Sequence, residues 1–151
     1  MLTKSKPATK TISISRVIHA PCEKVFRAWT DPKHLAQWFS PEDIECRSVE
    51  ANPKVGGAFR IHMVSKKGDH IAVGKFTALV KNKRVQMTWE WESYRMPDSL
   101  LTIDLEDLGA TTHLTLTHSG LPDAEDASGH KKGWTSALRK LARLMKQNKI
   151  K

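Results

Sequence analysis

Long apolar runs, paired cysteines and secretion signals are all lacking in this 151-residue chain. No run approaches the ~18 apolar residues of a membrane-spanning helix, and the polar start Met1–Lys10 lacks the apolar stretch of a signal peptide. The only two cysteines, Cys22 and Cys46, form no metal-type pair and provide no disulfide framework. We therefore expect a cytoplasmic protein with reduced thiols and no membrane span.

Motifs that bind metals or phosphates, or that activate a nucleophile, are also missing. The seven histidines are scattered, at positions 19, 34, 62, 70, 113, 118 and 130, without the spacing of a metal site. No Gly-x-Ser-x-Gly or phosphate-binding glycine pattern occurs, and Gly56-Gly57 is typical of a tight bend or bulge. Cys22 opens an expected helix but has no evident partner histidine. We therefore expect no metal and no cofactor, and no local motif requires an enzyme.

Acidic residues are absent from both ends of the chain, although its composition, with 39% hydrophobic residues, is that of an ordinary globular domain. Of the net charge of +9, residues 1–10 carry +3 and residues 127–151 carry eight cations, while residues 11–126 sum to −2. Clustered cations attract nucleic acid, but cations also suit the C-terminal end of a helix. We favour a solvated helix face over nucleic-acid binding.

The pattern of apolar residues predicts a strand, two short helices and then more strands. Alternation predicts a strand over Thr11–His19, followed by helices over Cys22–Thr30 and from Pro32 to about Trp38. The links between later segments are short, which favours antiparallel neighbours. Six further strands are expected, over Ile44–Ala51, Ala58–Val64, His70–Lys81, Arg84–Glu92, Leu100–Leu108 and Thr111–Ser119.

The last segment has a helical period. Trp134, Leu138, Leu141 and Met145 form an apolar stripe on one side of a long helix. The sequence therefore predicts an α+β fold, a curved antiparallel sheet of about seven strands wrapped around this helix, with two short helices after the first strand. Such a sheet readily leaves a hollow beside the helix. We expect a flexible basic tail over residues 1–10 and a single domain over residues 11–148.

Strand alternation also identifies candidate cavity residues. It places Trp89 and Trp91 on one strand face and His118 on another apolar face. A ligand pocket is typically a concave apolar site with a few polar groups, but the same side chains also fit a plain core, and His118 fits a hydrogen-bonded structural residue. Arg60 alternates with apolar neighbours and faces either solvent or a polar part of the interior. The candidates are Phe59, His62, Met63, Met87, Trp89, Trp91, Leu116, His118, Trp134 and Leu138.

A series of short stretches runs through the chain from about Thr11 to Met145. They are Arg16–Pro21, Val25-Phe26, Ala28–Pro32, Leu35, Gln37-Trp38, Gly56–Arg60, Gly74, Arg84-Val85, Thr88-Trp89, Thr111–Leu116, His118–Leu121, His130, Gly133-Trp134 and Leu138–Leu141. In order and spacing they resemble the family named after the activator of the heat-shock-protein-90 ATPase. The resemblance covers nearly the whole chain.

The resemblance implies the helix-grip fold of the START-like superfamily, which also contains polyketide cyclases and the birch-pollen allergen type. There, a cavity between sheet and C-terminal helix binds lipids, sterols, polyketides or other hydrophobic molecules, and a minority of members catalyse reactions in it. In the family's namesake this kind of domain follows a separate N-terminal domain that makes the main stimulatory contact. Here the fold starts at Thr11, so the resemblance gives a chaperone partner little support.

Three hypotheses follow from these observations. The leading one is a non-catalytic binding protein for a small hydrophobic or aromatic molecule. The second is a cyclase or aromatase type of enzyme, in which at least two of His118, His62 and Arg60 would face one bound molecule. The third is an interaction module that uses cations of the terminal helix, such as Arg139 and Arg143, to meet an acidic partner, for example a chaperone.

Overall fold

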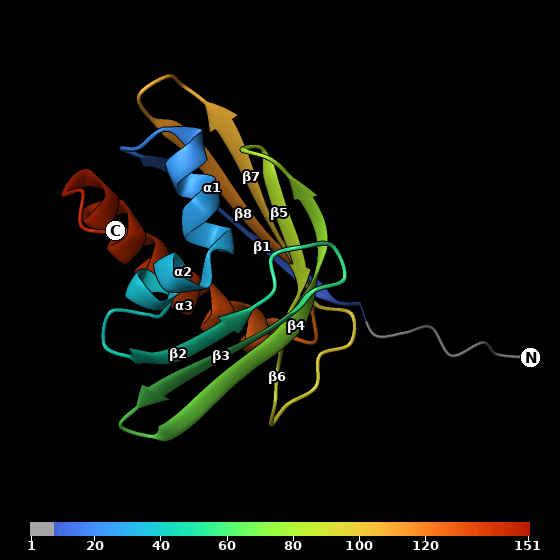
Figure 1. Ribbon diagram of the computed structural model, residues 1–151. Helices are drawn as coiled ribbons and strands as arrows, with labels where there is room; N and C mark the ends of the chain where they lie inside the picture. The colour runs from blue at the N-terminus through green and yellow to red at the C-terminus, as the bar shows by residue number, and fades with distance from the viewer. Residues whose placement is uncertain (1–7) are drawn as a thin grey trace, which may run out of the picture.

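The computed structural model describes residues 8–151, and within them eight strands form one antiparallel sheet (Figure 1). The strand order is β1-β8-β7-β5-β4-β3-β2, and β6 pairs with β4 away from this path. Short hairpin links make β2 to β5, and β7 and β8, neighbours in the sheet. The strands are β1 (Lys10–Ile18), β2 (Glu45–Ala51), β3 (Ala58–Ser65), β4 (Gly68–Val80), β5 (Arg84–Thr88), β6 (Glu90–Trp91), β7 (Leu100–Asp107) and β8 (Thr112–Leu121).

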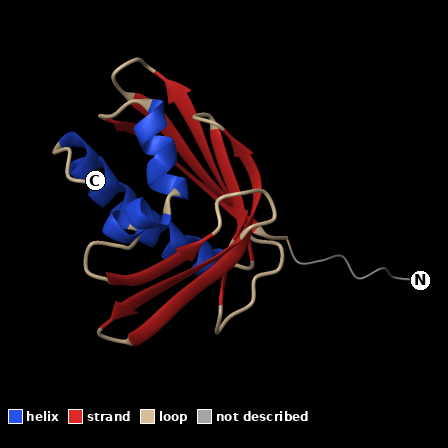
Figure 2. Cartoon of the chain, in the orientation of Figure 1, coloured by secondary structure: helices blue, strands red, loops and turns tan. Residues whose placement is uncertain are grey.

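Three helices lie together on one side of the curved sheet (Figures 1 and 2). α1 (Cys22–Thr30) and α2 (Pro32–Trp38) are separated by Asp31. The side chain of Asp31 accepts a hydrogen bond of 2.9 Å from the backbone N–H of Lys33, and a proline fits the first helical turn, so α2 starts at this point. α3 (Ala124–Lys146) is the long terminal helix, and Asp123 caps its N-terminus.

α3 faces the sheet with its apolar stripe. Trp134, Leu138, Leu141 and Met145 are buried, and the helix contacts β1 and β8. Burial of this stripe is the main force that holds the helix against the sheet. The opposite side of the helix is exposed and basic, and carries Lys131, Lys132, Arg139, Arg143 and Lys146.

The expected strand Arg84–Glu92 is wrong in one respect, because it is interrupted at Trp89 and forms two strands, β5 and β6. β4 pairs with both. At Gly74 it passes so close to the interruption that a Cβ atom would collide with the carbonyl oxygen of Thr88. The N–H of Lys75 donates to the hydroxyl of Thr88 at 2.9 Å. A glycine at a close approach of this kind allows the sheet to bend sharply.

The architecture confirms the expected fold class. A curved antiparallel sheet around a long C-terminal helix, with two short helices after the first strand, is the helix-grip fold. The expected N-terminal tail falls mostly on residues 1–7, which lie outside the described residues, and β1 already begins at Lys10. Within residues 8–151, no helix has both the length and the apolar character needed to cross a membrane.

Candidate functional site

A cavity of about 430 Å³ lies between the N-terminal half of α3 and the part of the sheet formed by β3, β4 and β6. The helix leaves this space because two of the residues facing it are glycines. A Cβ atom built on Gly133 would meet nothing closer than Cγ of Pro41, at 3.9 Å. α3 lines the cavity with Glu125, Asp126, Gly129, His130, Gly133, Trp134 and Ala137.

The other walls come from the sheet and from the segment that follows α2. Met63 on β3, His70 on β4 and Trp91 on β6 face the space, together with Trp89 at the strand interruption. The segment between α2 and β2 closes the cavity next to Gly133 and Ala137 and contributes Phe39, Ser40, Pro41 and Ile44.

Four aromatic residues form a continuous wall of the cavity. The ring centroids of Trp89 and Trp134 are 5.0 Å apart, and Phe39 lies 5.6 Å from Trp134. Trp91 stands at 82° to Trp89 with a centroid distance of 5.4 Å, so the two indoles make a corner. Such edge and tilted contacts stabilise aromatic clusters. The result is a rigid apolar surface drawn from α3, the sheet and the segment after α2.

His118 on β8 does not line the cavity, but it supports this wall through a hydrogen bond to Trp134. Its ring is fully buried (0% exposed), and its Nδ1 accepts a hydrogen bond of 3.0 Å from the indole N–H of Trp134. The neutral ring therefore carries its proton on Nε2 and donates it to Oγ of Ser99 at 2.6 Å. Burial, with a smaller contribution from the nearby His130, lowers the pKa of His118 to about 3. His118 is thus a neutral residue that fixes the orientation of Trp134.

His130 on α3 fixes the second indole in the same way. The N–H of Trp91 donates to Nε2 of His130 at 3.1 Å, so Nδ1 carries the proton and donates it to the backbone carbonyl of Asp126 at 2.8 Å. The rings of His118 and His130 lie 5.1 Å apart at 84°. Each histidine therefore holds one indole of the wall through one ring nitrogen and is itself anchored through the other.

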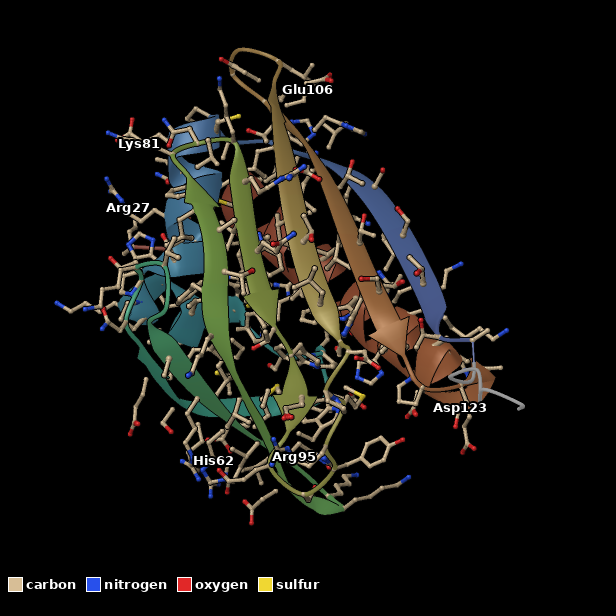
Figure 3. All side chains as sticks on the ribbon, turned by 90° about the vertical axis from the view of Figure 1, so that its right-hand side faces the viewer. Arg27, His62, Lys81, Arg95, Glu106 and Asp123 are labelled. Carbon is tan, nitrogen blue, oxygen red and sulfur yellow. The ribbon has the colours of Figure 1, made fainter. Side chains whose placement is uncertain are left out.

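Of the ten candidates from the sequence, four meet at the cavity: Met63, Trp89, Trp91 and Trp134. Five others are buried in the core without lining it: Phe59, Met87, Leu116, His118 and Leu138. His62 lies on the other face of β3, where Nε2 is 2.7 Å from Oδ1 of Asp69. Arg60 shares that face and donates from Nε to Glu92 at 3.0 Å. Figure 3 looks onto this outer face, with His62 at one end of it. That any of these residues binds a ligand stays a prediction.

The sequence reasoning did not identify most of the α3 side of the cavity or the segment that follows α2. One signal was available: Gly129, Gly133 and Ala137 are spaced four residues apart, which places three small side chains on one face of the helix. The partners of that face come from distant parts of the chain and carry no local pattern. The missed lining residues are Phe39, Ser40, Pro41, Ile44, His70, Glu125, Asp126, Gly129, His130, Gly133 and Ala137.

Among residues 8–151, no group of three or more histidine, cysteine or acidic side chains is arranged to hold a metal ion. Cys22 and Cys46 are free cysteines. Burial raises the pKa of the Cys46 thiol to about 11, which keeps it protonated at neutral pH.

Comparisons with solved structures agree with this architecture. A crystal structure of a protein from Chromobacterium violaceum is 31% identical in sequence, with 89% of this chain and 96% of that chain covered and a TM-score of 0.79. The AHSA1 protein of Silicibacter pomeroyi is 27% identical, with coverages of 92% and 99% and a TM-score of 0.78. An AHSA1-like protein from Aeromonas hydrophila, at 23% identity and a TM-score of 0.74 over 94% and 96% of the two chains, shares the fold.

A comparison with curated proteins gives no match. A family model does match: the model described as Activator of Hsp90 ATPase homolog 1-like protein covers residues 19–146. Together with the Chromobacterium structure, this match extends over most of the chain, including every element from α1 to α3. The chain therefore belongs to the family of Activator of Hsp90 ATPase homolog 1-like proteins, which have a START-like fold.

Proposed function

We propose that the protein binds a small hydrophobic or aromatic molecule in this cavity and does not transform it. The observation that carries the proposal is the wall of Phe39, Trp89, Trp91 and Trp134 around a space of about 430 Å³. This volume lies within the range of roughly 300–1,000 Å³ that is usual for small-molecule sites. Burial of apolar ligand surface gains about 25 cal/mol per Å² before the ligand's loss of freedom is subtracted.

Binding has more support than catalysis because most histidine ring nitrogens near the cavity already have hydrogen-bond partners within the protein. Both ring nitrogens of His118 and of His130 are engaged, those of His118 with an indole and a serine hydroxyl and those of His130 with an indole and a backbone carbonyl. The cyclase-type alternative requires at least two of His118, His62 and Arg60 to reach one bound molecule. Arg60 and His62 lie on the outer face of the sheet, and His118 does not line the cavity, so the cyclase-type alternative has less support.

Titration with a neutral fluorescent probe, N-phenyl-1-naphthylamine, tests the proposal. We expect saturable binding with enhanced probe fluorescence and quenching of the tryptophans in the wall. The variant Gly133→Leu should weaken binding by about tenfold or more, because its side chain enters the space beside Pro41.

The matched control is Ser128→Leu, which adds a leucine to the exposed side of α3. It should bind the probe like the unaltered protein. If the unaltered protein does not bind the probe, or if Gly133→Leu binds it equally well, the cavity is not the site. Native mass spectrometry of the freshly purified protein, followed by denaturing extraction, would then identify the chemical class of any ligand that it carries.

A further inference from the structure

The cavity has a charge opposite to that of the chain as a whole. The protein carries a net charge of +9, yet none of the residues lining the cavity is a lysine or arginine. Two carboxylates, those of Glu125 and Asp126, line the end at the first turn of α3. A negative, aromatic-lined space in a basic protein favours a positively charged ligand.

The two carboxylates are available to a ligand. Within residues 8–151, neither Glu125 nor Asp126 has a cationic side chain within 4.0 Å. Oδ2 of Asp126 accepts a hydrogen bond of 2.9 Å from the hydroxyl of Tyr94, which leaves its charge in place. Arg95 follows Tyr94 in the sequence but does not pair with Asp126. It donates to both carboxylate oxygens of Glu90, at 2.7 and 2.8 Å. No cationic side chain among residues 8–151 therefore neutralises the acidic end of the cavity.

Neighbouring groups strengthen the negative potential at this end. Asp123, the N-cap of α3, adds a third carboxylate, and three carboxylates outweigh the roughly half positive charge at a helix N-terminus. The same carboxylates affect the hydroxyl of Tyr94. Its hydrogen bond to Asp126, its desolvation and the charges of Asp126, Asp123 and Glu125 raise the pKa of its hydroxyl above the ordinary value.

The aromatic wall reaches the acidic end through Trp91. Two backbone hydrogen bonds, of 3.1 and 3.2 Å, join Trp91 to Tyr94, whose hydroxyl binds Asp126. Trp91 also donates to His130, one turn along α3 from Asp126. An ammonium group within about 6 Å of a tryptophan ring centroid is attracted by the ring, and adjacent carboxylates add to that attraction.

The other end of the cavity has the opposite polarity. Ser40 lines the cavity near Ala137, and its hydroxyl accepts a hydrogen bond of 3.2 Å from Nζ of Lys140. A cation would be repelled at this end and attracted at the first turn of α3. The cavity therefore orients a cationic ligand in one direction.

We infer that the ligand is an organic cation, a quaternary or protonated amine attached to an aromatic or alicyclic body. The ammonium group lies at Trp91, Glu125 and Asp126, and the apolar body extends along Trp89 and Trp134 toward Phe39. This inference rests on the proposed function, since it names the ligand class of the same cavity.

The test is a matched pair of probes, (2-naphthylmethyl)trimethylammonium and its neutral carbon isostere 2-neopentylnaphthalene, titrated at low salt with tryptophan quenching as the signal. We expect the cation to bind about tenfold more tightly than the isostere. Its affinity should also fall as salt is added, whereas that of the isostere should not fall. In the double variant Glu125→Gln, Asp126→Asn, the preference for the cation should shrink to about twofold or less.

The control is Glu106→Gln, which removes a carboxylate at the end of the molecule opposite Asp123 and Arg95 (Figure 3). It should leave the preference unchanged. If both probes bind equally, if the isostere binds better, or if the double variant keeps the full preference, the inference is wrong while the proposed function stands. If neither probe nor N-phenyl-1-naphthylamine binds, both fail. Unchanged thermal unfolding of the double variant will show that it is folded.

Discussion

The two halves of α3 differ in what they place against the sheet. Its N-terminal half presents Gly129, Gly133 and Ala137 to an open cavity. Its C-terminal half presents Leu138, Leu141 and Met145, which are buried in the core. Both halves belong to one helix and face one sheet. The small side chains of Gly129, Gly133 and Ala137 therefore leave a space between helix and sheet that the larger side chains further along α3 fill.

This comparison separates two properties that one core usually combines. The filled half supplies stability, because its large side chains are removed from water. The hollow half gives up part of that stability, because a wall next to empty space loses packing contacts. Two of its four aromatic side chains, Trp134 and Trp91, are held in place by His118 and His130 instead. A change in the filled half should therefore alter stability without altering binding, and a filling change such as Gly133→Leu should do the reverse.

The largest expected effect is on the filled half. Leu141 is fully buried (0% exposed), so Leu141→Ala should lower the free energy of unfolding by about 3 kcal/mol, measured by denaturant titration. Affinity for N-phenyl-1-naphthylamine should stay within about twofold of that of the unaltered protein. The volume-conserving control Leu141→Met should cost less than about 1.5 kcal/mol. A large loss of affinity in folded Leu141→Ala would show that the two halves are coupled.

Lowering the pH is expected to have an intermediate effect on stability, and this effect arises at His118, the histidine that supports the wall. The pKa of His118 is about 3 in the folded protein and near 6.5 when the chain is unfolded. Between these values the unfolded chain binds a proton that the folded protein does not, so stability falls as the pH is lowered below 6.5. At pH 5 the loss relative to pH 7 is about 2 kcal/mol from this residue.

Denaturant titrations at pH 7 and pH 5 measure this loss, with His118→Phe as the comparison. The variant should be less stable at pH 7, because the N–H of Trp134 and the hydroxyl of Ser99 lose their partner. Its further loss between pH 7 and pH 5 should be smaller than that of the unaltered protein by about 2 kcal/mol. An NMR titration in which the His118 ring gains a proton above pH 5 would contradict the prediction.

The smallest effect is expected on the outer face of the sheet. His62 is half-buried and paired with Asp69, away from the cavity lining. His62→Ala should therefore leave probe affinity unchanged and alter stability by less than about 1 kcal/mol, because a surface pair with the exposed side chain of Asp69 contributes little. Fluorescence titration checks the affinity. A clear loss of binding would place this face in contact with the ligand.

The fold was largely predictable from the sequence because its elements depend on local patterns. Alternating apolar residues indicated the strands, and the stripe from Trp134 to Met145 indicated the long helix. The interruption at Trp89 was missed, because it depends on a close approach by Gly74 of the neighbouring strand. The site was predictable only in part. Trp89, Trp91 and Trp134 could be assigned to inner faces. Leu138 shares the inner face of α3 with Trp134 but lies in the core, so the pattern does not show where the core ends and the cavity begins.

The sequence by itself determined the order of strands and helices, the inward faces and the basic outer face of α3, since each follows from the spacing of residues along one element. Only the tertiary structure decided that Gly133 lies opposite Pro41, that His118 and His130 hold two indoles, and that Glu125 and Asp126 meet an aromatic wall. These relations join residues from distant segments. They exist only after the sheet has curved around the helix, because packing in three dimensions brings the segments together.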